Sequence, residues 1–257
     1  RRLARHGGLR CSLVLGRGML SDDTEHAWLT GHALVASRGE VPAFRRALAW
    51  RLRGWLLALP PAVGLATARG IVRLWLGWSP ERSGVRSAGN GPLMRAAVIG
   101  AVACDDAHVV ELVAASTRMT HLDPRAEQAA LVIARLARAA APVATAVDAI
   151  ADPELRARTR QALAAADDHA ELEHLRAALS FERGVTGFVN DTLPAVVFCS
   201  QRWPHDPPAA IEAAIRLGGD TDTVAALVGA LVGATTGPSA LPERWLAGIR
   251  DWPLTLG

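Results

Sequence analysis

The chain has 257 residues, half of them apolar, and a formal net charge of +3. This length and apolar content allow a sizeable buried core, so we expect a globular protein. A charge of +3 over the whole chain is too dilute to indicate a nucleic-acid-binding surface, and all of the positive charge comes from arginine.

Apolar residues recur three and four positions apart through nearly the whole chain, whereas the alternating runs typical of strands are scarce. Phe44, Leu48 and Leu52 begin one such face, and glycine or proline separates the periodic runs. No linker or fixed repeat divides them, so we expect an all-α fold, compact and single-domain, over residues 1–257. The predicted helices cover residues 22–37, 42–58, 65–76, 92–103, 107–119, 125–140, 142–150, 153–165, 168–180, 188–201, 208–217, 223–235 and 242–249.

The first predicted helix begins with Ser21, Asp22 and Asp23. Serine is a favoured N-cap, and carboxylates in the first turn complement the helix dipole. Taken alone, this segment is explained as an ordinary helix start.

The same pattern returns almost two hundred residues later, where Asp220, Asp222 and Thr223 follow two glycines at the start of another predicted helix. One helix needs one cap, not three carboxyl and hydroxyl groups in four positions. Such oxygen ligands suit Mg²⁺ or Mn²⁺ rather than zinc, and the carboxylates would repel one another without cations. We therefore predict one site for two divalent ions, formed by Ser21, Asp22, Asp23, Asp220, Asp222 and Thr223.

Two segments between these motifs are candidates for ligand binding. The short loop from Ser87 to Gly91 precedes a predicted helix, and its N–H groups can hold phosphate oxygens, although Gly-Asn-Gly alone is typical of a turn. Arg95 either supports this loop by hydrogen bonds or pairs with a carboxylate. His121 stands near the end of a predicted helix, where histidine is commonly only a dipole partner.

Four stretches together resemble the ADP-ribosylglycohydrolases: the serine-aspartate-aspartate motif, residues 86–97, residues 116–124, and GGDTDT at 218–223. The resemblance runs from about residue 17 to residue 237. It implies that two Mg²⁺ or Mn²⁺ ions are held by the two acidic motifs, with serine in place of the commoner threonine at position 21. It also implies an ADP-ribose pocket lined by Ser87, Gly89, Asn90, Gly91 and His121.

The resemblance further implies hydrolysis of the bond between ribose C1 and a modified side chain. The substrate would be an ADP-ribosylated protein, arginine-linked by default, or a small molecule that contains ADP-ribose. The metal ions would orient the ribose hydroxyls and a water and lower the pKa of that water. Asp23 or Asp220 would handle the proton.

One departure separates two hypotheses. Family members usually begin with a Gly-Asp-Ala-x-Gly helix and a following glutamate, whereas residues 1–16 contain no acidic residue. We expect either an N-terminally truncated enzyme, which the missing initiator Met favours, or a member that binds ADP-ribose without hydrolysing it. A third hypothesis, a metal-free structural or interaction protein, requires both acidic motifs to be caps only.

The aromatic residues indicate core positions rather than stacked bases. Trp50, Trp55, Trp75 and Trp78 recur at spacings that predict one hydrophobic face. The resemblance implies that residues 185–188 border the pocket and contact the ribose or adenine. An aromatic residue at helical spacing is more often a core residue, which favours the core for Phe188.

The cysteines and the apolar runs indicate in which cellular compartment we expect the protein. Cys11, Cys104 and Cys199 lie far apart with no paired spacing, which argues against a disulfide framework or a zinc clip. The longest apolar runs, such as 224–234, have about 11 residues, well short of the roughly 20 that a membrane span needs. We expect a cytoplasmic protein with no membrane contact and no nucleic-acid partner.

Overall fold

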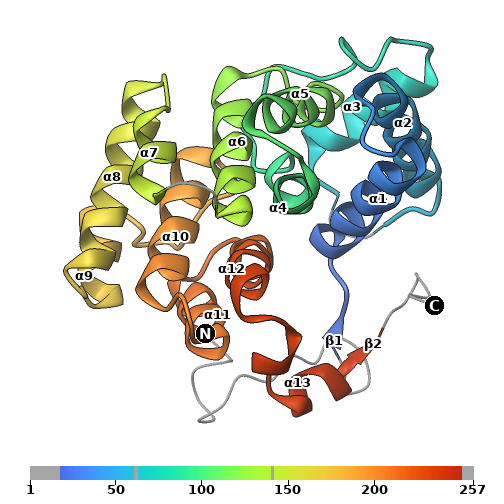
Figure 1. Ribbon diagram of the computed structural model, residues 1–257. Coiled ribbons are helices and arrows are strands. Elements are labelled where there is room, and N and C mark those ends of the chain that lie inside the picture. The colour runs from blue at the N-terminus through green and yellow to red at the C-terminus, as the bar shows by residue number, and fades with distance from the viewer. Residues whose placement is uncertain (1–17, 61–62, 140–141, 251–257) are drawn as a thin grey trace.

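The computed structural model describes residues 18–60, 63–139 and 142–250, and thirteen α-helices account for most of these residues (Figure 1). The helices of the first half are α1 (Asp22–Ser37), α2 (Val41–Leu57), α3 (Leu65–Trp75), α4 (Leu93–Val102), α5 (Asp106–Thr117) and α6 (Pro124–Arg138). Those of the second half are α7 (Val143–Asp148), α8 (Pro153–Asp167), α9 (Leu172–Ala178), α10 (Val189–Arg202), α11 (Pro207–Leu217), α12 (Thr221–Thr236) and α13 (Glu243–Ala247). Each matches a helix predicted from the sequence, with ends that differ by a few residues, so the all-α fold class is confirmed.

Two very short strands were not predicted. β1 (Gly18–Met19) and β2 (Ile249–Arg250) pair in parallel, with Gly18 opposite Ile249 and Met19 opposite Arg250. Two residues are too few to produce an alternating apolar pattern, so the sequence carries no signal for them. The pairing places the segment before α1 beside the segment after α13 (Figure 1).

Helices α4 and α12 lie at the centre of the packing. α4 contacts α1, α5, α6 and α12, and α12 contacts α10 and α11 as well (Figure 1). α4 and α6 cross closely because Gly100 lies against the Ala134 backbone, where any Cβ would overlap the Ala134 carbonyl. α1 also packs against α12, and this contact brings together helix starts from opposite ends of the described chain.

The predicted apolar face of α2 is confirmed, because Phe44, Leu48, Leu52 and Trp55 are all buried. The prediction that four tryptophans share a hydrophobic face is wrong for Trp50, Trp75 and Trp78, which are exposed. Trp50 is two residues from both Leu48 and Leu52, roughly 200° around the helix, so it faces away from the core.

Trp75 and Trp78 are exposed at and beyond the end of α3. The buried stripe of α3 is formed by Thr67, Gly70, Ile71 and Leu74. Trp75 lies one residue beyond this stripe, and the Trp78 position follows the end of the helix.

Among the described residues, no helix combines the length and the apolar character needed to cross a bilayer.

Candidate functional site

The starts of α1 and α12 bring three carboxylates together. Asp22, Asp23 and Asp222 each place one oxygen within 4.8 Å of an oxygen of the other two. We call these three residues the acidic cluster. The structure therefore joins the two acidic motifs that the sequence suggested as partners.

Helix capping does not account for these motifs. Ser21 and Asp220 occupy the N-cap positions of α1 and α12, but neither side chain makes a capping hydrogen bond. The Ser21 hydroxyl instead donates to Asp23 Oδ2 at 2.9 Å. The same fold does use side-chain caps at other helices, from Asp105, Asp123, Asp152 and Asp206. Side-chain capping hydrogen bonds from Ser21 and Asp220 therefore do not explain the two motifs.

The carboxylates of the acidic cluster repel one another when ionised, and they are partly buried. Burial, followed by the charge of Asp22, raises the pKa of Asp23 to about 7. Burial, followed by the charge of Asp222, raises the pKa of Asp22 to about 6. Asp23 is only 2% exposed, and its Oδ1 atom has no hydrogen-bond partner within the described residues. Ionised carboxylates in this arrangement need a compensating positive charge.

Asp220 lies next to the cluster, on the side of the glycine loop. Burial raises its pKa, and neighbouring Asp222 raises it further. The Asn90 side-chain amide donates to Asp220 Oδ2 at 2.7 Å. Thr223 is buried, and its hydrogen bonds lower the pKa of both Asp23 and Asp220. Asp220 and Thr223 thus extend the cluster toward the loop, although Asp220 is not one of its three closest carboxylates.

The glycine loop is fixed by the segment before α10. The backbone N–H of Asn90 donates to the Gly187 carbonyl at 2.9 Å, and that of Val189 donates to the Ala88 carbonyl at 3.0 Å. The Asn90 amide also donates to Thr192 Oγ1 at 3.1 Å. Asn90 therefore connects the predicted binding loop with the predicted metal site.

Two glycines allow Asp220 to reach this position. The Asp220 N–H donates to the Val185 carbonyl at 2.8 Å, and the Val185 N–H donates to the Gly218 carbonyl at 3.0 Å. Gly184 and Gly219 both have positive φ angles, and a Cβ on either would overlap the backbone of the opposite segment. Gly184 and Gly219 thus permit a backbone contact that no larger residue allows.

His121 lies beneath the glycine loop rather than on its open side. Only 2% of the residue is exposed, and Cβ atoms built at Gly91 and Gly89 would lie 3.0 Å and 3.2 Å from its ring. Burial lowers its pKa to about 3, so the ring is neutral. Its predicted contact with substrate stays a prediction; its contact with both loop glycines is direct.

Arg95 supports the loop only indirectly and does not pair with a carboxylate in the described part of the chain. The side chain is fully buried, and burial lowers its pKa to about 10. It donates to Ser116 Oγ at 2.8 Å and to Thr120 Oγ1 at 2.9 Å. The Thr120 hydroxyl in turn lies 2.9 Å from His121 Nδ1. Arg95 therefore holds His121 through Thr120.

His26 is a buried polar residue that the sequence reasoning missed. Its Nδ1 lies 2.9 Å from Arg95 Nη1, and a guanidinium can only donate, so Nδ1 accepts and the ring proton is on Nε2. That Nε2 has no hydrogen-bond partner among the described residues. Burial, followed by the charge of Arg95, lowers the His26 pKa well below its ordinary value. In the sequence, only its position three residues after Asp23 indicated that His26 lies near the site.

Phe188 is also placed differently from the sequence interpretation. It is the N-cap residue of α10 and is exposed, so its assignment to the core is wrong. The ring lies 5.0 Å from the Arg125 guanidinium, and its backbone forms an antiparallel bridge with Gly89. An aromatic face therefore stands beside the glycine loop.

Comparisons with known proteins agree with this geometry. A family model described as ADP-ribosylglycohydrolase matches residues 1–256. An uncharacterized protein of Archaeoglobus fulgidus is 29% identical over 249 residues, covering 92% of this chain and 77% of that protein. A solved structure titled "ADP-ribosylglycohydrolase-related protein complex" matches with a TM-score of 0.69 and 27% identity, over 90% of this chain and 76% of that chain. The family match includes residues 1–16. The sequence has no acidic residue there, and this segment lies outside the residues that the structure describes.

Proposed function

Because the chain belongs to the ADP-ribosylglycohydrolase family, we propose that it hydrolyses the glycosidic bond between ADP-ribose and a modified protein side chain. Arginine is the proposed acceptor, and a small molecule that contains ADP-ribose is the other substrate class. The observation that carries this proposal is the meeting of the acidic cluster with Asp220 and the Asn90 loop. This arrangement supports a cation site beside a phosphate-binding loop.

The residues present fit two Mg²⁺ or Mn²⁺ ions. Asp23 Oδ1 is buried and has no donor among the residues that the structure describes, and a hard cation relieves both this lack and the mutual repulsion of the carboxylates. When bound, such ions supply Lewis-acid chemistry and a water of lowered pKa. The residues that would hold them are Ser21, Asp22, Asp23, Asp220, Asp222 and Thr223.

The loop and its neighbours would bind the ADP-ribose moiety. The proposed contacts with the diphosphate are Ser87, Gly89, Asn90 and Gly91. The Asn90 N–H already donates to the Gly187 carbonyl and the Gly89 N–H to Ser87 Oγ, so other donors of the loop would serve the phosphate oxygens. The exposed ring of Phe188 offers a face for stacking beside them.

The Thr120 hydroxyl is closer to His121 Nδ1, at 2.9 Å, than to the Thr117 carbonyl, at 3.4 Å. This difference favours a hydrogen bond from the Thr120 hydroxyl to His121 Nδ1. The His121 ring proton is then on Nε2, the nitrogen that faces Gly89.

Asp220 is the carboxylate we assign to proton transfer. Three observations support this assignment: its pKa is raised, it is partly exposed, and it accepts a hydrogen bond from Asn90. A carboxylate there can accept a proton and stabilise the oxocarbenium character that develops at ribose C1. Asp23 is enclosed within the acidic cluster, where its role is to bind cations.

Release of ADP-ribose from an arginine-ADP-ribosylated protein tests the proposal. We expect release that depends on Mg²⁺ or Mn²⁺ and falls on the order of 100-fold or more in Asp222→Asn, because a cation ligand is lost. Asp167→Asn is the matched control, since Asp167 is exposed at the end of α8. Wild-type rates in Asp222→Asn would contradict the proposal. Binding of ADP-ribose by the wild type without release would support the non-hydrolysing alternative.

A further inference from the structure

The segment from residue 41 to residue 80 has an unusual composition. It contains six arginines and four tryptophans, and no acidic residue stands between Glu40 and Glu81. It forms α2, α3 and the segments that follow them, at one edge of the molecule (Figure 1). Segments of this length with a charge of +6 attract anionic partners.

The outward side of this segment is rich in large apolar side chains. Leu59 in the turn after α2 is 85% exposed, Leu76 after α3 is 72% exposed, and Trp50 on α2 is 65% exposed. A soluble monomer rarely leaves so many large apolar groups in water without a use for them. The exposed large apolar residues of the segment are Trp50, Leu57, Leu59, Leu65, Val72, Trp75, Leu76 and Trp78.

Arginine side chains connect the three exposed tryptophans of this segment. The Arg53 guanidinium lies 4.7 Å from the Trp50 ring and donates to the Leu74 carbonyl at 2.7 Å. The Trp75 indole donates to the Arg53 carbonyl at 3.3 Å. Near the end of α3, the Arg73 guanidinium lies 4.9 Å from the Trp78 ring. We call this combined surface of α2 and α3 the tryptophan–arginine surface.

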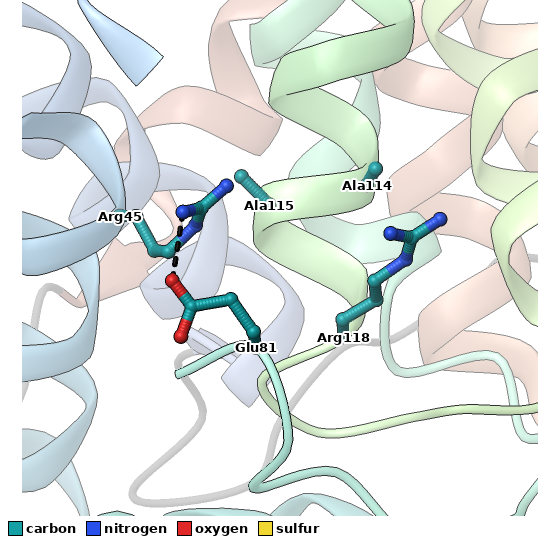
Figure 2. A pocket seen from close by; sticks show the side chains of 5 residues that line it. All are labelled: Arg45, Glu81, Ala114, Ala115 and Arg118. Carbon is teal, nitrogen blue, oxygen red and sulfur yellow. Dashed lines mark hydrogen bonds and ion pairs between the residues drawn. The ribbon is translucent and has the colours of Figure 1, made fainter. Parts of the chain in front are cut away.

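Most of its positive charge is not neutralised within the described residues. Arg45 pairs with Glu81 at 2.7 Å beside a cavity of about 40 Å³ that is also lined by Ala114, Ala115 and Arg118 (Figure 2). None of the other five arginines of the segment forms an ion pair in the described ranges. A larger hollow of about 320 Å³ on α3 is lined by Ala68, Arg69, Val72 and Arg73. This hollow offers two cations to an anionic group.

We propose that the tryptophan–arginine surface binds the face of an anionic lipid bilayer, with α2 and α3 lying on it. Arginines would contact anionic headgroups, and the tryptophan and leucine side chains would enter the interfacial region, as in amphipathic interfacial helices. This departs from our expectation of no membrane contact, which rested on the absence of a spanning segment. It involves no residue of the acidic cluster, and its test is independent of hydrolysis.

Two other occupants fit the surface less well. A second copy of the chain, related by a two-fold axis, would set one group of arginines against another with no carboxylate between them. An acidic protein would satisfy the charges but not the apolar side chains that project from the turn after α2 and the end of α3. A bilayer supplies negative charge and apolar depth over the same area.

Co-sedimentation of the full chain with vesicles tests the proposal. We expect sedimentation with phosphatidylcholine vesicles that contain phosphatidylglycerol, and none with phosphatidylcholine alone. The pair Arg46→Gln and Arg69→Gln should weaken binding at least about tenfold, because each arginine near the surface contributes favourably. The pair Leu59→Ser and Leu76→Ser should weaken it about tenfold as well, because less apolar surface enters the bilayer.

Matched controls separate this effect from general charge or misfolding. Arg183→Gln and Val102→Ser change exposed residues outside the surface and should bind vesicles like the wild type, with all variants checked by thermal unfolding. Equal binding to both vesicle types, or unchanged binding in either double variant, would overturn the proposal. So would binding to polyglutamate or RNA with no sedimentation on anionic vesicles, since this would assign the surface to another class of partner.

Discussion

Substitution of Asp23 by asparagine should stabilise the metal-free protein. The folded state raises the pKa of Asp23 to about 7 and that of Asp22 to about 6, above the ordinary value of 3.8. A folded state that binds protons more tightly loses stability as the pH rises. The stabilising contribution is complete below about pH 4 and is lost as the pH passes through these raised values. Asparagine keeps the shape and removes the charge that must be ionised.

The size of the effect follows from the Asp23 shift. A change of one pKa unit corresponds to about 1.4 kcal/mol, so ionising Asp23 costs the folded protein about 4 kcal/mol above pH 7. Asparagine also weakens the hydrogen bond that Ser21 donates to this carboxylate. We therefore expect a gain of about 2 to 4 kcal/mol, which for a chain of this size is roughly 4 to 8 °C in Tm.

Thermal unfolding in the presence of EDTA at pH 5 and pH 8 measures this effect. From pH 5 to pH 8 the Tm of Asp23→Asn should rise relative to that of the wild type, and the variant should melt at a higher temperature at pH 8. The buried neutral His26 and His121 add the same pH dependence to both proteins, so the difference in Tm isolates Asp23. Added Mg²⁺ or Mn²⁺ should then stabilise the wild type much more than the variant. Asp167→Asn should behave like the wild type throughout. A variant that melts at or below the wild-type Tm at pH 8 in EDTA would refute the electrostatic reasoning.

Three further predictions concern the groups around the cluster. Gly219→Ala should lower the Tm and abolish ADP-ribose release, because its Cβ overlaps the Val185 backbone; circular dichroism and the release assay measure both. Arg95→Met should lower the free energy of unfolding in urea by about 1 to 3 kcal/mol, because it leaves the buried hydroxyls of Ser116 and Thr120 without their donor. Asn90→Leu should lower kcat about 10- to 100-fold with little change in Tm, since the Asp220 carboxylate loses its donor.

Much of the helical framework was predictable because the apolar period is local. Phe44, Leu48 and Leu52 identify both the extent of α2 and its buried face. The same period puts Trp50 on the face opposite Leu48 and Leu52, but it could not tell whether another part of the chain covers that face. Three of the four tryptophans in this region are exposed for that reason.

The meeting of the acidic motifs was predictable from charge, and its details were not. Repeated carboxylates at two helix starts suggested a shared cation site, and Asp22 and Asp222 do lie together. The position of Asp220 depends on a close backbone contact between Gly184 and Gly219, which no local pattern encodes. The contact between His26 and Arg95 joins residues 69 positions apart, so only the tertiary fold reveals it.

Calorimetric titration of Mn²⁺ most directly tests whether α1 and α12 share one cation site. The experiment compares the wild type with Asp22→Asn, Asp222→Asn and the double variant, with Asp167→Asn as control. We predict that either single substitution weakens binding strongly and that the double variant is little worse than the single ones, because both side chains serve the same site. Wild-type affinity in Asp222→Asn, or strictly additive losses in the double variant, would contradict a shared site.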